Sequence, residues 1–317
     1  MRIAVMGAGS LGLLFAARLA ASGAAVELVT RTVNQAELLQ FQGIRLMEPD
    51  GSRQIVRPAV ISAWPQRPLA QAPDVLLLTL KQPALTEELL VELALRLAAN
   101  TLVVGLQNGI GHEDKLRSAL GADRVTLAVT TEAARRESAT GVTHTGRGMT
   151  YIESALHDGS EAEQGNGRIE RQKLLLGMLR QAGFSANLSN DMDIRIWTKL
   201  LINAVINPLT AMLQVNNGGL LHSRWALGMM EALLEEGKRV AALQGVRLPD
   251  DLWQTVLDVC TATADNHSSM LRDVQMGRPT EIDTMNGSLL RIAEKHGLTL
   301  PEHQTVYRFV KALEPKR

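Results

Sequence analysis

The sequence predicts an α/β fold in which an N-terminal domain with a mainly parallel sheet precedes a second, all-helical domain. Short apolar runs alternate with helical sequence in the first half of the chain, and no strand pattern recurs after Asp191. The length of 317 residues also exceeds what one hydrophobic core usually serves. We therefore expect a domain boundary near Asn190, with one domain over residues 1–189 and the other over residues 190–317.

The first element is an apolar strand, Met1–Met6, which runs into the glycine turn Gly7-Ala8-Gly9-Ser10-Leu11-Gly12. An apolar helical stretch to Ala20 and a second strand, Ala25–Val29, follow the turn. The first glycine permits a tight bend, the second lets backbone amides approach a pyrophosphate, and the third lets the helix pack close to the strand. This order of elements predicts a Rossmann-type dinucleotide-binding unit, with the phosphates at the helix N-terminus.

The same segment can be compared with a secretory signal peptide, which has a charged start, an apolar middle and a small-residue end. The glycines interrupt the apolar middle, and only one charge, Arg2, precedes it. The single cysteine, Cys260, gives no reason for an oxidising compartment. We therefore expect a cytoplasmic protein.

Composition is typical of an enzyme and not of an electrostatic binder. The 33 basic residues balance the 33 acidic ones, so no global field would attract nucleic acid or an anionic membrane. No apolar run has the length and purity of a membrane span. The seven histidines are scattered without paired spacing, so we expect no metal site.

The residues that distinguish NAD from NADP are expected at the end of the second strand. An acid there would bind the ribose of NAD, and an arginine would bind the 2′-phosphate of NADP. The residues at this position are Thr30 and Arg31, whereas Glu27 comes too early in the strand. Because a guanidinium offers a planar fork to a phosphate, Arg31 favours NADP. The alternative is that Arg31 is a solvated loop cation.

Three further apolar runs continue the parallel sheet: Asp74–Leu80, Thr101–Leu106 and Arg124–Val129. Helical sequence from Leu85 to Ala99 separates the first two. Since ligands bind beyond the carboxyl ends of such strands, Lys81, Asn108 and the small residues up to Ala134 are expected at the edge that carries the glycine turn. For Lys81 alone, a polar cap on a strand is an equally good account.

The pattern changes after this sheet. The stretch Gly141–Glu153 is β-prone and suits an antiparallel extension of the sheet. The polar, glycine-bearing segment Asp158–Gly167 is expected to be an exposed loop, and a helix from about Ile169 to Gln181 should follow it.

In the helical half, Lys199, Asn203 and Asn207 recur every four residues and would form one polar stripe on a helix. They could simply be the wet face of a surface helix. Asparagine is a poor helix former, however, and amides that bind a polar substrate would explain two of them in one helix. Pro208 also removes a hydrogen bond from the helix and frees a carbonyl.

A second cluster surrounds Ser269 and Asp273, which share one face of a predicted helix. Thr280 is expected to cap the next helix, with Asp283 reaching back in a variant of the capping box. Glu281 would then lie in the first turn of that helix, where an acid is favourable whatever the function.

These residues resemble those of one family, the ketopantoate reductases or 2-dehydropantoate 2-reductases of the pantothenate and coenzyme A pathway. The resemblance covers nearly the whole chain, and the helix with Lys199, Asn203, Asn207 and Pro208 is its specific part. It also includes Gln107-Asn108-Gly109, Asn217-Gly218, and the stretch Ser268-Ser269-Met-Leu-Arg-Asp273 leading to Thr280-Glu281-Ile-Asp283.

The resemblance implies an oxidoreductase that reduces 2-dehydropantoate to (R)-pantoate with NADPH, with Lys199 as proton donor. It implies substrate contacts from Asn108, Asn203, Asn207, Asn217 and Ser269. It implies cofactor contacts from the glycine turn Gly7 to Gly12, Arg31, Lys81, Asn108, Ala134 and Glu281. The helical domain would bind the substrate and catalyse the reaction.

Several alternatives stay open. The segment from Asn34 to Arg67 shows no motif, and Gly218-Gly219 stands where the family more often has glycine followed by an acid, so another branched 2-oxo acid could be the substrate. A β-hydroxyacid dehydrogenase shares the catalytic lysine, but its glycine-rich substrate motif is missing. A non-catalytic NADP-sensing protein is a further alternative. An apolar helical domain could also pair with its copy, so a homodimer stays open.

Overall fold

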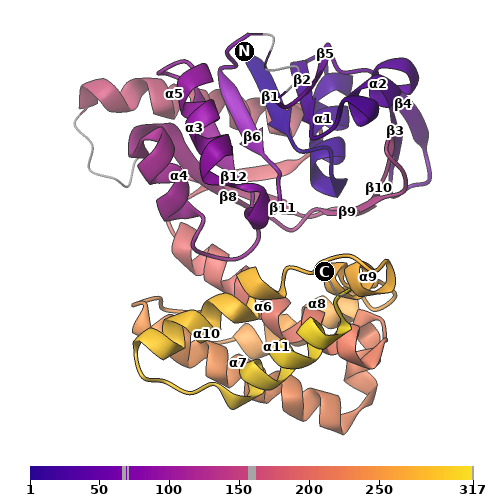
Figure 1. Ribbon diagram of the computed structural model, residues 1–317, viewed down its shortest axis with the longest axis vertical. Helices are drawn as coiled ribbons and strands as arrows, with labels where there is room; N and C mark the ends of the chain where they lie inside the picture. The colour runs from indigo at the N-terminus through magenta and orange to yellow at the C-terminus, as the bar shows by residue number, and fades with distance from the viewer. Residues whose placement is uncertain (66–68, 70, 156–161, 316–317) are drawn as a thin grey trace. The chain divides into compact units, whose positions relative to one another are not determined.

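A computed structural model of the chain describes residues 1–65, 69, 71–155 and 162–315. The chain divides into two compact units. The α/β unit comprises Met1–Gln107 and His112–Met192, and the helical unit comprises Asn108–Gly111 and Asp193–Arg317. The predicted fold class is confirmed, since strands occur only in the first unit of the described chain (Figure 1). The short segment Asn108–Gly111 belongs to the helical unit although it follows a strand of the α/β unit.

The α/β unit is built on an eight-stranded sheet with the order β12-β11-β8-β7-β6-β1-β2-β5. Its strands are β1 (Arg2–Met6), β2 (Ala25–Thr30), β5 (Val60–Ala63), β6 (Val75–Leu78), β7 (Leu102–Gly105), β8 (Val125–Thr130), β11 (Met149–Glu153) and β12 (Ser185–Ser189). All neighbours pair in parallel except β11 and β8, which are antiparallel. The carboxyl ends of β1, β2, β6, β7 and β8 therefore lie at one edge, as the sequence predicts.

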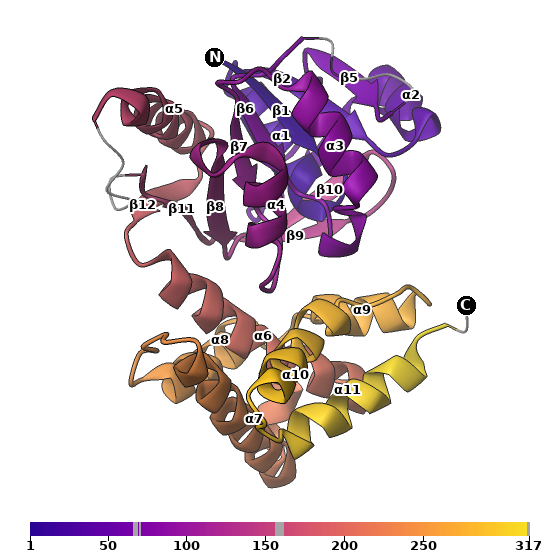
Figure 2. The ribbon, with the colours of Figure 1, turned by 60° about the vertical axis from the view of Figure 1, so that its left-hand side comes forward.

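Helices cover both faces of this sheet, so its central strands are buried on both sides. On one face the core contains side chains of α1 (Ser10–Ala21) and α5 (Ala162–Gln181). On the other it contains side chains of α3 (Glu87–Arg96) and α4 (Glu113–Leu120), which lie in front of the sheet in Figure 2. Alternate residues of β1 enter the two cores, which explains its continuous apolar run.

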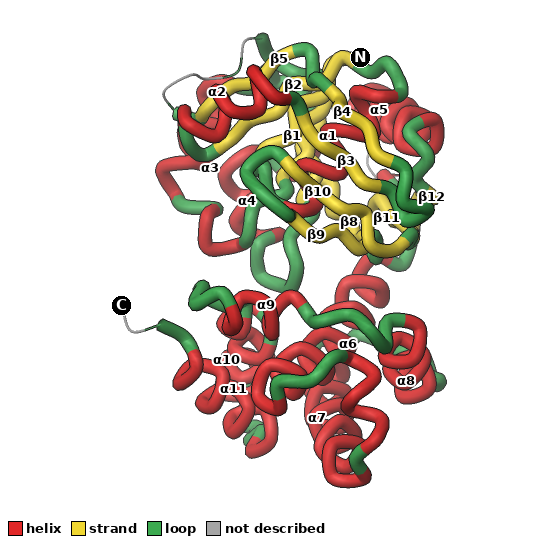
Figure 3. Tube along the Cα trace, turned by 90° about the vertical axis from the view of Figure 1, so that its right-hand side faces the viewer, coloured by secondary structure: helices red, strands yellow, loops and turns green. Residues whose placement is uncertain are grey.

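A second sheet packs on the opposite side of α1, in the order β4-β3-β10-β9 (Figure 3). Its strands are β3 (Ile44–Met47), β4 (Arg53–Val56), β9 (Ala133–Arg136) and β10 (Gly141–Gly146). The predicted antiparallel extension is thus right for β11 but wrong for β10, which pairs with β9 and β3 in the second sheet. The stretch without a motif in the sequence supplies α2 (Val33–Gln42), β3, β4 and β5.

The exposed loop predicted over Asp158–Gly167 is wrong in its second half, because α5 already begins at Ala162. Residues 158–161 lie outside the described part of the chain. Polar residues and glycines suggest a loop by composition, yet the first turns of a surface helix accept the same residues. The Gly167 carbonyl accepts a hydrogen bond of 2.9 Å from Nη1 of Arg171, one turn further along the helix.

The helical unit packs around α6 (Met192–Leu213). Its other helices are α7 (Arg224–Leu243), α8 (Leu252–Ala262), α9 (Ser269–Gln275), α10 (Asn286–Lys295) and α11 (Pro301–Leu313). Short 3₁₀ turns in the two units are η1 (Gln82–Ala84), η2 (Ala122–Arg124), η4 (Asn217–His222) and η5 (Ile282–Thr284). By length and composition α6 could cross a membrane, but 61% of its apolar window is buried inside the protein, as in a core helix.

Candidate active site

Hydrogen bonds to strand and helix neighbours hold the glycine turn in place. The amide of Gly7 donates to the Val29 carbonyl at 2.9 Å, and Oγ1 of Thr79 donates to the Gly7 carbonyl at 2.9 Å. On the outer side, Nε2 of Gln35 donates to the Ala8 carbonyl at 3.1 Å. The shape of the turn therefore depends on its own backbone and also on Thr79 and Gln35, which belong to no motif in the sequence.

The three glycines of the turn are needed for different reasons. Gly7 has a backbone φ of +113°, a value that residues with a side chain rarely adopt. A Cβ on Gly12 would lie 1.7 Å from the Gly7 carbonyl oxygen. A Cβ on Gly9, by contrast, would meet no protein atom within 4 Å. Gly9 is also the N-cap of α1 and gives that helix no side-chain cap. An open face at an uncapped helix N-terminus fits the phosphates of a dinucleotide.

Three other residues that the resemblance assigns to the cofactor belong to this unit. Arg31 directly follows β2, Lys81 is the N-cap residue of η1 beyond β6, and both side chains are exposed. Ala134 lies in β9 and is half-buried. The backbone of β9 also reaches the turn, since the Arg136 amide donates to Oγ of Ser10 at 3.2 Å. Arg31 and Lys81 thus follow the carboxyl ends of β2 and β6, whereas Ala134 lies in a strand of the second sheet.

In the helical unit, three predicted site residues form a chain of hydrogen bonds. Nζ of Lys199 donates to Oδ1 of Asn108 at 2.8 Å, and Nδ2 of Asn108 donates to Oε2 of Glu281 at 3.4 Å. The amide thus turns its oxygen to the cation and its nitrogen to the anion. Asn108 separates Lys199 from Glu281, so the ammonium is oriented without a direct salt bridge to the carboxylate.

The surroundings of Lys199 change its titration. Burial lowers the pKa of the ammonium from 10.5 to about 8, against the charge of Glu281, which raises it. Glu281 is itself buried, with 7% of its surface exposed. An ammonium with a pKa near neutral pH can both hold and release a proton, as a general acid must.

The polar stripe of α6 continues from Lys199 with two amides. Asn203 is half-buried and makes no hydrogen bond with any residue that the structure describes. Asn207 is buried, and the hydrogen bond from its Nδ2 goes to the weak acceptor Sδ of Met285, at 3.8 Å. Both amides therefore have unused hydrogen-bonding groups that could bind a polar ligand. Since Asn207 is buried, it does not fit the alternative that the stripe is a solvated helix face.

The two remaining predicted substrate contacts differ from each other. Asn217 is buried and donates from Nδ2 to Thr263 at 2.8 Å, while its Oδ1 has no hydrogen-bond partner among the described residues. Ser269 is the exposed first residue of α9. Its neighbour Ser268 is buried and caps that helix by accepting from the Leu271 amide at 3.0 Å. The serine pair thus divides into a capping residue and an exposed hydroxyl.

The carbonyl that Pro208 frees in α6 has a specific partner. Nδ2 of Asn286 donates to the Ala204 carbonyl at 2.9 Å and lies 2.9 Å from Nδ1 of His303. Nε2 of His303 lies 3.0 Å from the Leu233 carbonyl and must donate to it, which leaves Nδ1 as the acceptor. Burial lowers the pKa of His303 to about 4, so this ring stays neutral. The sequence predicts the free carbonyl but not Asn286, whose only signal is an asparagine in an amphipathic helix.

The predicted capping box at Asp283 is wrong. Its carboxylate accepts from the hydroxyl of Tyr307 at 2.6 Å and from Nζ of Lys311 at 3.0 Å. Thr280 accepts from the Ile282 amide at 3.3 Å, and Glu281 occupies the N-cap position of the 3₁₀ turn η5, without a side-chain cap, instead of the first turn of a helix. Partners on α11 therefore attract the Asp283 side chain away from the local backbone, which sequence spacing alone does not reveal.

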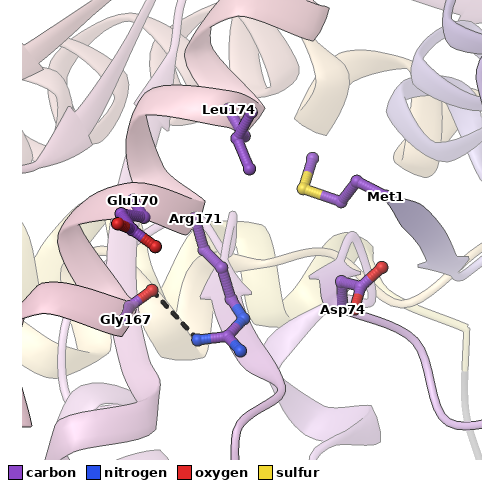
Figure 4. Close-up of a pocket in the computed structure, with 6 residues that line it drawn as sticks. All are labelled: Met1, Asp74, Gly167, Glu170, Arg171 and Leu174. Atoms are coloured by element: carbon purple, nitrogen blue, oxygen red, sulfur yellow. Dashed lines mark hydrogen bonds between the residues drawn. The ribbon is translucent and has the colours of Figure 1, made fainter.

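A pocket elsewhere in the α/β unit lies at the opposite edge of the sheet (Figure 4). Its lining residues are Met1, Asp74, Gly167, Glu170, Arg171 and Leu174. The first two precede β1 and β6, so the pocket is at the amino ends of these strands. Ligands of open parallel sheets bind at the carboxyl ends, and none of the predicted site residues lines this pocket.

Comparisons with known proteins agree over both units. Residues 3–156 match the family described as "Ketopantoate reductase PanE/ApbA", and residues 191–314 match "Ketopantoate reductase PanE/ApbA C terminal". The 2-dehydropantoate 2-reductase of Bacillus subtilis is 34% identical over 99% of this chain and 98% of its own, and that of Archaeoglobus fulgidus is 30% identical over the same shares.

Solved structures give the same result. A PanE/ApbA family ketopantoate reductase from Ralstonia eutropha has a TM-score of 0.86 and 27% identity, with 99% of this chain and 98% of that chain covered. A D-mandelate dehydrogenase with NADH and anilino(oxo)acetate has the same TM-score and coverage at 26% identity. The two family matches cover both units of the chain and include the residues of the glycine turn and of α6. This chain belongs to the ketopantoate reductase family.

Proposed function

We propose that the protein reduces 2-dehydropantoate to (R)-pantoate with NADPH. The observation that carries the proposal is the hydrogen-bond chain from Lys199 through Asn108 to Glu281. It presents a partly buried ammonium whose pKa burial lowers to about 8, on a helix that also carries Asn203 and Asn207.

The chemistry of a ketone reduction fits this arrangement. A nicotinamide coenzyme supplies the hydride when bound. Negative charge then develops on the carbonyl oxygen, and an ammonium at that oxygen stabilises it and delivers the proton that completes the alcohol. In this proposal Nζ of Lys199 is the proton donor, and Asn108 orients it by accepting one of its hydrogen bonds.

The substrate contacts are proposed from side chains with unused hydrogen-bonding capacity. We assign Asn203, Asn207, Asn217 and Ser269 to the carboxylate and hydroxyl of the 2-oxo acid. Neutral amides and a hydroxyl can bind these groups without adding a charge that would draw Lys199 into a salt bridge. The buried, unpaired Oδ1 of Asn217 supports this assignment, because an unsatisfied buried acceptor is costly without a ligand.

The cofactor contacts are proposed from the carboxyl edge of the sheet in the α/β unit. The turn Gly7-Ala8-Gly9-Ser10-Leu11-Gly12 would hold the pyrophosphate, and the open space over Gly9 supports this. The exposed Arg31 at the end of β2 would bind the 2′-phosphate and select NADPH. Lys81, Ala134, Asn108 and Glu281 would complete the cofactor contacts, so that the α/β unit binds NADPH and the helical unit carries the reacting lysine.

A second candidate is the reductase of another 2-oxo acid. The D-mandelate dehydrogenase structure, with NADH and anilino(oxo)acetate, has a TM-score of 0.86 to this chain, so the fold also serves a different acid and a different nicotinamide cofactor. The family match and the identity to curated 2-dehydropantoate 2-reductases favour ketopantoate.

The test is an NADPH-consumption assay over ketopantoate and a panel of branched and aromatic 2-oxo acids, with NADH in parallel. We expect the highest kcat/KM with ketopantoate and NADPH, and an Arg31→Ala variant should lose preference for NADPH by about tenfold or more. A higher kcat/KM with another acid would replace the substrate. NADPH binding without turnover of any oxo acid would instead support a sensing protein.

We further propose a cytoplasmic homodimer. The sole cysteine of the chain, Cys260, is buried and unpaired, as in a reducing compartment. Trp225 in α7 and Phe309 in α11 expose 75% and 57% of their surfaces, which supports an apolar contact with a second copy. Sedimentation equilibrium should give twice the chain mass for the parent, and a Trp225→Ser variant should shift it toward the monomer.

A further inference from the structure

A cluster of four charged or titratable side chains, the buried charge network, lies inside the α/β unit, whereas Lys199 belongs to the helical unit. It consists of Arg18, Glu48, Glu132 and His144, none of which exposes more than 12% of its side chain. Arg18 donates to both carboxylate oxygens of Glu48, at 3.0 and 2.9 Å. Nδ1 of His144 lies 3.2 Å from Glu48, and its Nε2 lies 2.6 Å from Oε2 of Glu132.

The number of protons in this network follows from its geometry. Each contact of His144 needs one proton between its nitrogen and the facing carboxyl oxygen. Glu48, Glu132 and His144 together therefore hold two protons, which gives these three groups one net negative charge wherever the protons lie. The charge of Arg18 balances it, so the network as a whole is neutral although it contains four ionisable groups. Neutrality lets it be buried without an uncompensated charge.

The network joins segments that are distant in the sequence. Arg18 comes from the last turn of α1, the helix that begins at the glycine turn, and His144 comes from β10. Glu132 lies in the connection between β8 and β9, directly before Ala133-Ala134. In the register of the second sheet His144 stands opposite Ala134. The side-chain bond to Glu132 and the backbone pairing to Ala134 thus fix one short segment from the same residue.

The segment Thr131–Ala134 is also held from its other side. A Cβ on Gly148 would lie 2.3 Å from the carbonyl carbon of Thr131, so the backbone packs directly on this glycine. The Glu132 amide donates to Oγ1 of Thr130 at 3.2 Å. The carboxylate of Glu132 faces His144, so the segment is held by contacts on both sides.

We propose that Glu132 and His144 are positioning residues that hold the backbone of Thr131–Ala134 in the conformation that contacts the nucleotide. The proposal rests on the proposed function, in which Ala134 meets the cofactor. Stability of the fold alone does not require buried ionisable side chains, because apolar residues of similar volume at the same positions often give a folded state that is equally stable or more stable. Aligning one short segment at the edge of a ligand site does need directional bonds, which this network supplies.

The experiment measures NADPH affinity by quenching or transfer of tryptophan fluorescence, and turnover by NADPH consumption with ketopantoate. In Glu132→Ala the tether to His144 is lost, and we expect the Kd for NADPH to rise by about tenfold or more. The KM for ketopantoate and kcat at saturating NADPH should stay within about twofold, because neither Lys199 nor its partners are touched. Glu132→Gln keeps a hydrogen bond to the ring and a neutral network, so it should retain the parent's Kd within about threefold.

A matched control is Gln172→Ala, which removes another buried polar side chain of the same unit. Gln172 in α5 bonds Thr126, Glu153 and Ala155, at the opposite end of β8. This variant should lower Tm without changing the Kd for NADPH. If Glu132→Ala is not obtained folded, Glu132→Asp shortens the tether by one methylene and should raise the Kd by about threefold or more.

The outcomes separate this inference from the proposed function. A parent protein that does not bind NADPH would overturn both. A parent that binds NADPH, with an unchanged Kd in Glu132→Ala or an equal rise in Gln172→Ala, would overturn only the positioning role. An equally raised Kd in Glu132→Gln and Glu132→Ala would also contradict it, since the amide preserves the tether.

Discussion

The glycine turn of the α/β unit and the Lys199 helix of the helical unit specify their sites in opposite ways. In the turn the absence of side chains is decisive: Gly12 is forced by a backbone atom 1.7 Å from its missing Cβ, and Gly9 leaves space that no protein atom fills. On the helix the side chains are decisive. The side chain of Lys199 bonds Asn108, that of Asn203 bonds none of the described residues, and that of Asn207 bonds only the weak acceptor of Met285.

The difference shows how binding and reaction can be divided along one chain. Backbone amides and a helix N-terminus bind a phosphate group common to many nucleotides, so the turn carries little information about the reaction. A lysine with a lowered pKa can transfer a proton, which is the role that we propose for Lys199 on α6. Substitutions in the two regions should therefore separate NADPH affinity from turnover.

The largest effect is expected at Lys199. In Lys199→Ala the developing oxyanion loses its cation and its proton source, and kcat with ketopantoate should fall by about a thousandfold. Lys199→Arg restores the charge but not the proton, because a guanidinium does not release one near neutral pH, so it should recover only a minor part of the rate. Steady-state kinetics at saturating NADPH measure both. A Lys199→Arg variant as fast as the parent would mean that charge alone is needed.

Two alanine substitutions in the turn should differ from each other. Gly12→Ala drives a methyl group into the Gly7 carbonyl and should destabilise the fold by about 3 kcal/mol or more, measured by urea unfolding. Gly9→Ala meets no protein atom, so the unfolding free energy should change by less than about 1 kcal/mol. Its Kd for NADPH should rise by about tenfold or more, because the methyl group enters the phosphate space. Similar stability losses in both variants would contradict the distinction.

The pH dependence tests the charge around the lysine. We propose the protonated amine of Lys199 as the donor, and burial lowers its pKa to about 8, so kcat/KM for ketopantoate should be level below this pH and fall above it. Glu281 raises the pKa of Lys199, so Glu281→Gln should move the fall to lower pH. A pH–rate profile from pH 6 to 10 measures the shift, and a shift to higher pH would contradict the sign.

The smallest effect is expected at Asn286, which donates a hydrogen bond to the Ala204 carbonyl of α6. Asn286→Ala leaves the Ala204 carbonyl without its donor and should lower the unfolding free energy by about 1–3 kcal/mol. Among the described residues the hydrogen bonds of Asn286 go to Ala204 and His303, neither of which is a proposed site residue, so kcat should stay within about threefold. Denaturant unfolding and steady-state kinetics of the same preparation give both values. A loss of turnover without a loss of stability would place Asn286 in the reaction instead.

The sequence predicts the regions in which local rules suffice. Glycine spacing gives the turn, apolar runs give the parallel strands, and four-residue spacing gives the stripe of α6, and the structure has all three. It does not predict contacts between distant segments. The Asp283 carboxylate accepts a hydrogen bond from Lys311 and not from the nearby backbone. Strand β10 pairs with β3 in the second sheet and not with the eight-stranded sheet. The buried charge network is of this second kind, because its four members are up to 126 residues apart and follow no spacing rule.

The division of labour between the two units is tested most directly by measuring NADPH Kd and single-turnover NADPH oxidation with ketopantoate in Gly9→Ala and Lys199→Ala side by side. We predict a crossed result: Gly9→Ala weakens NADPH binding but oxidises bound NADPH at a rate close to the parent's, whereas Lys199→Ala binds NADPH with nearly the parent's affinity and oxidises it about a thousandfold more slowly. Turnover of NADPH-saturated Lys199→Ala at the parent's rate would contradict the account.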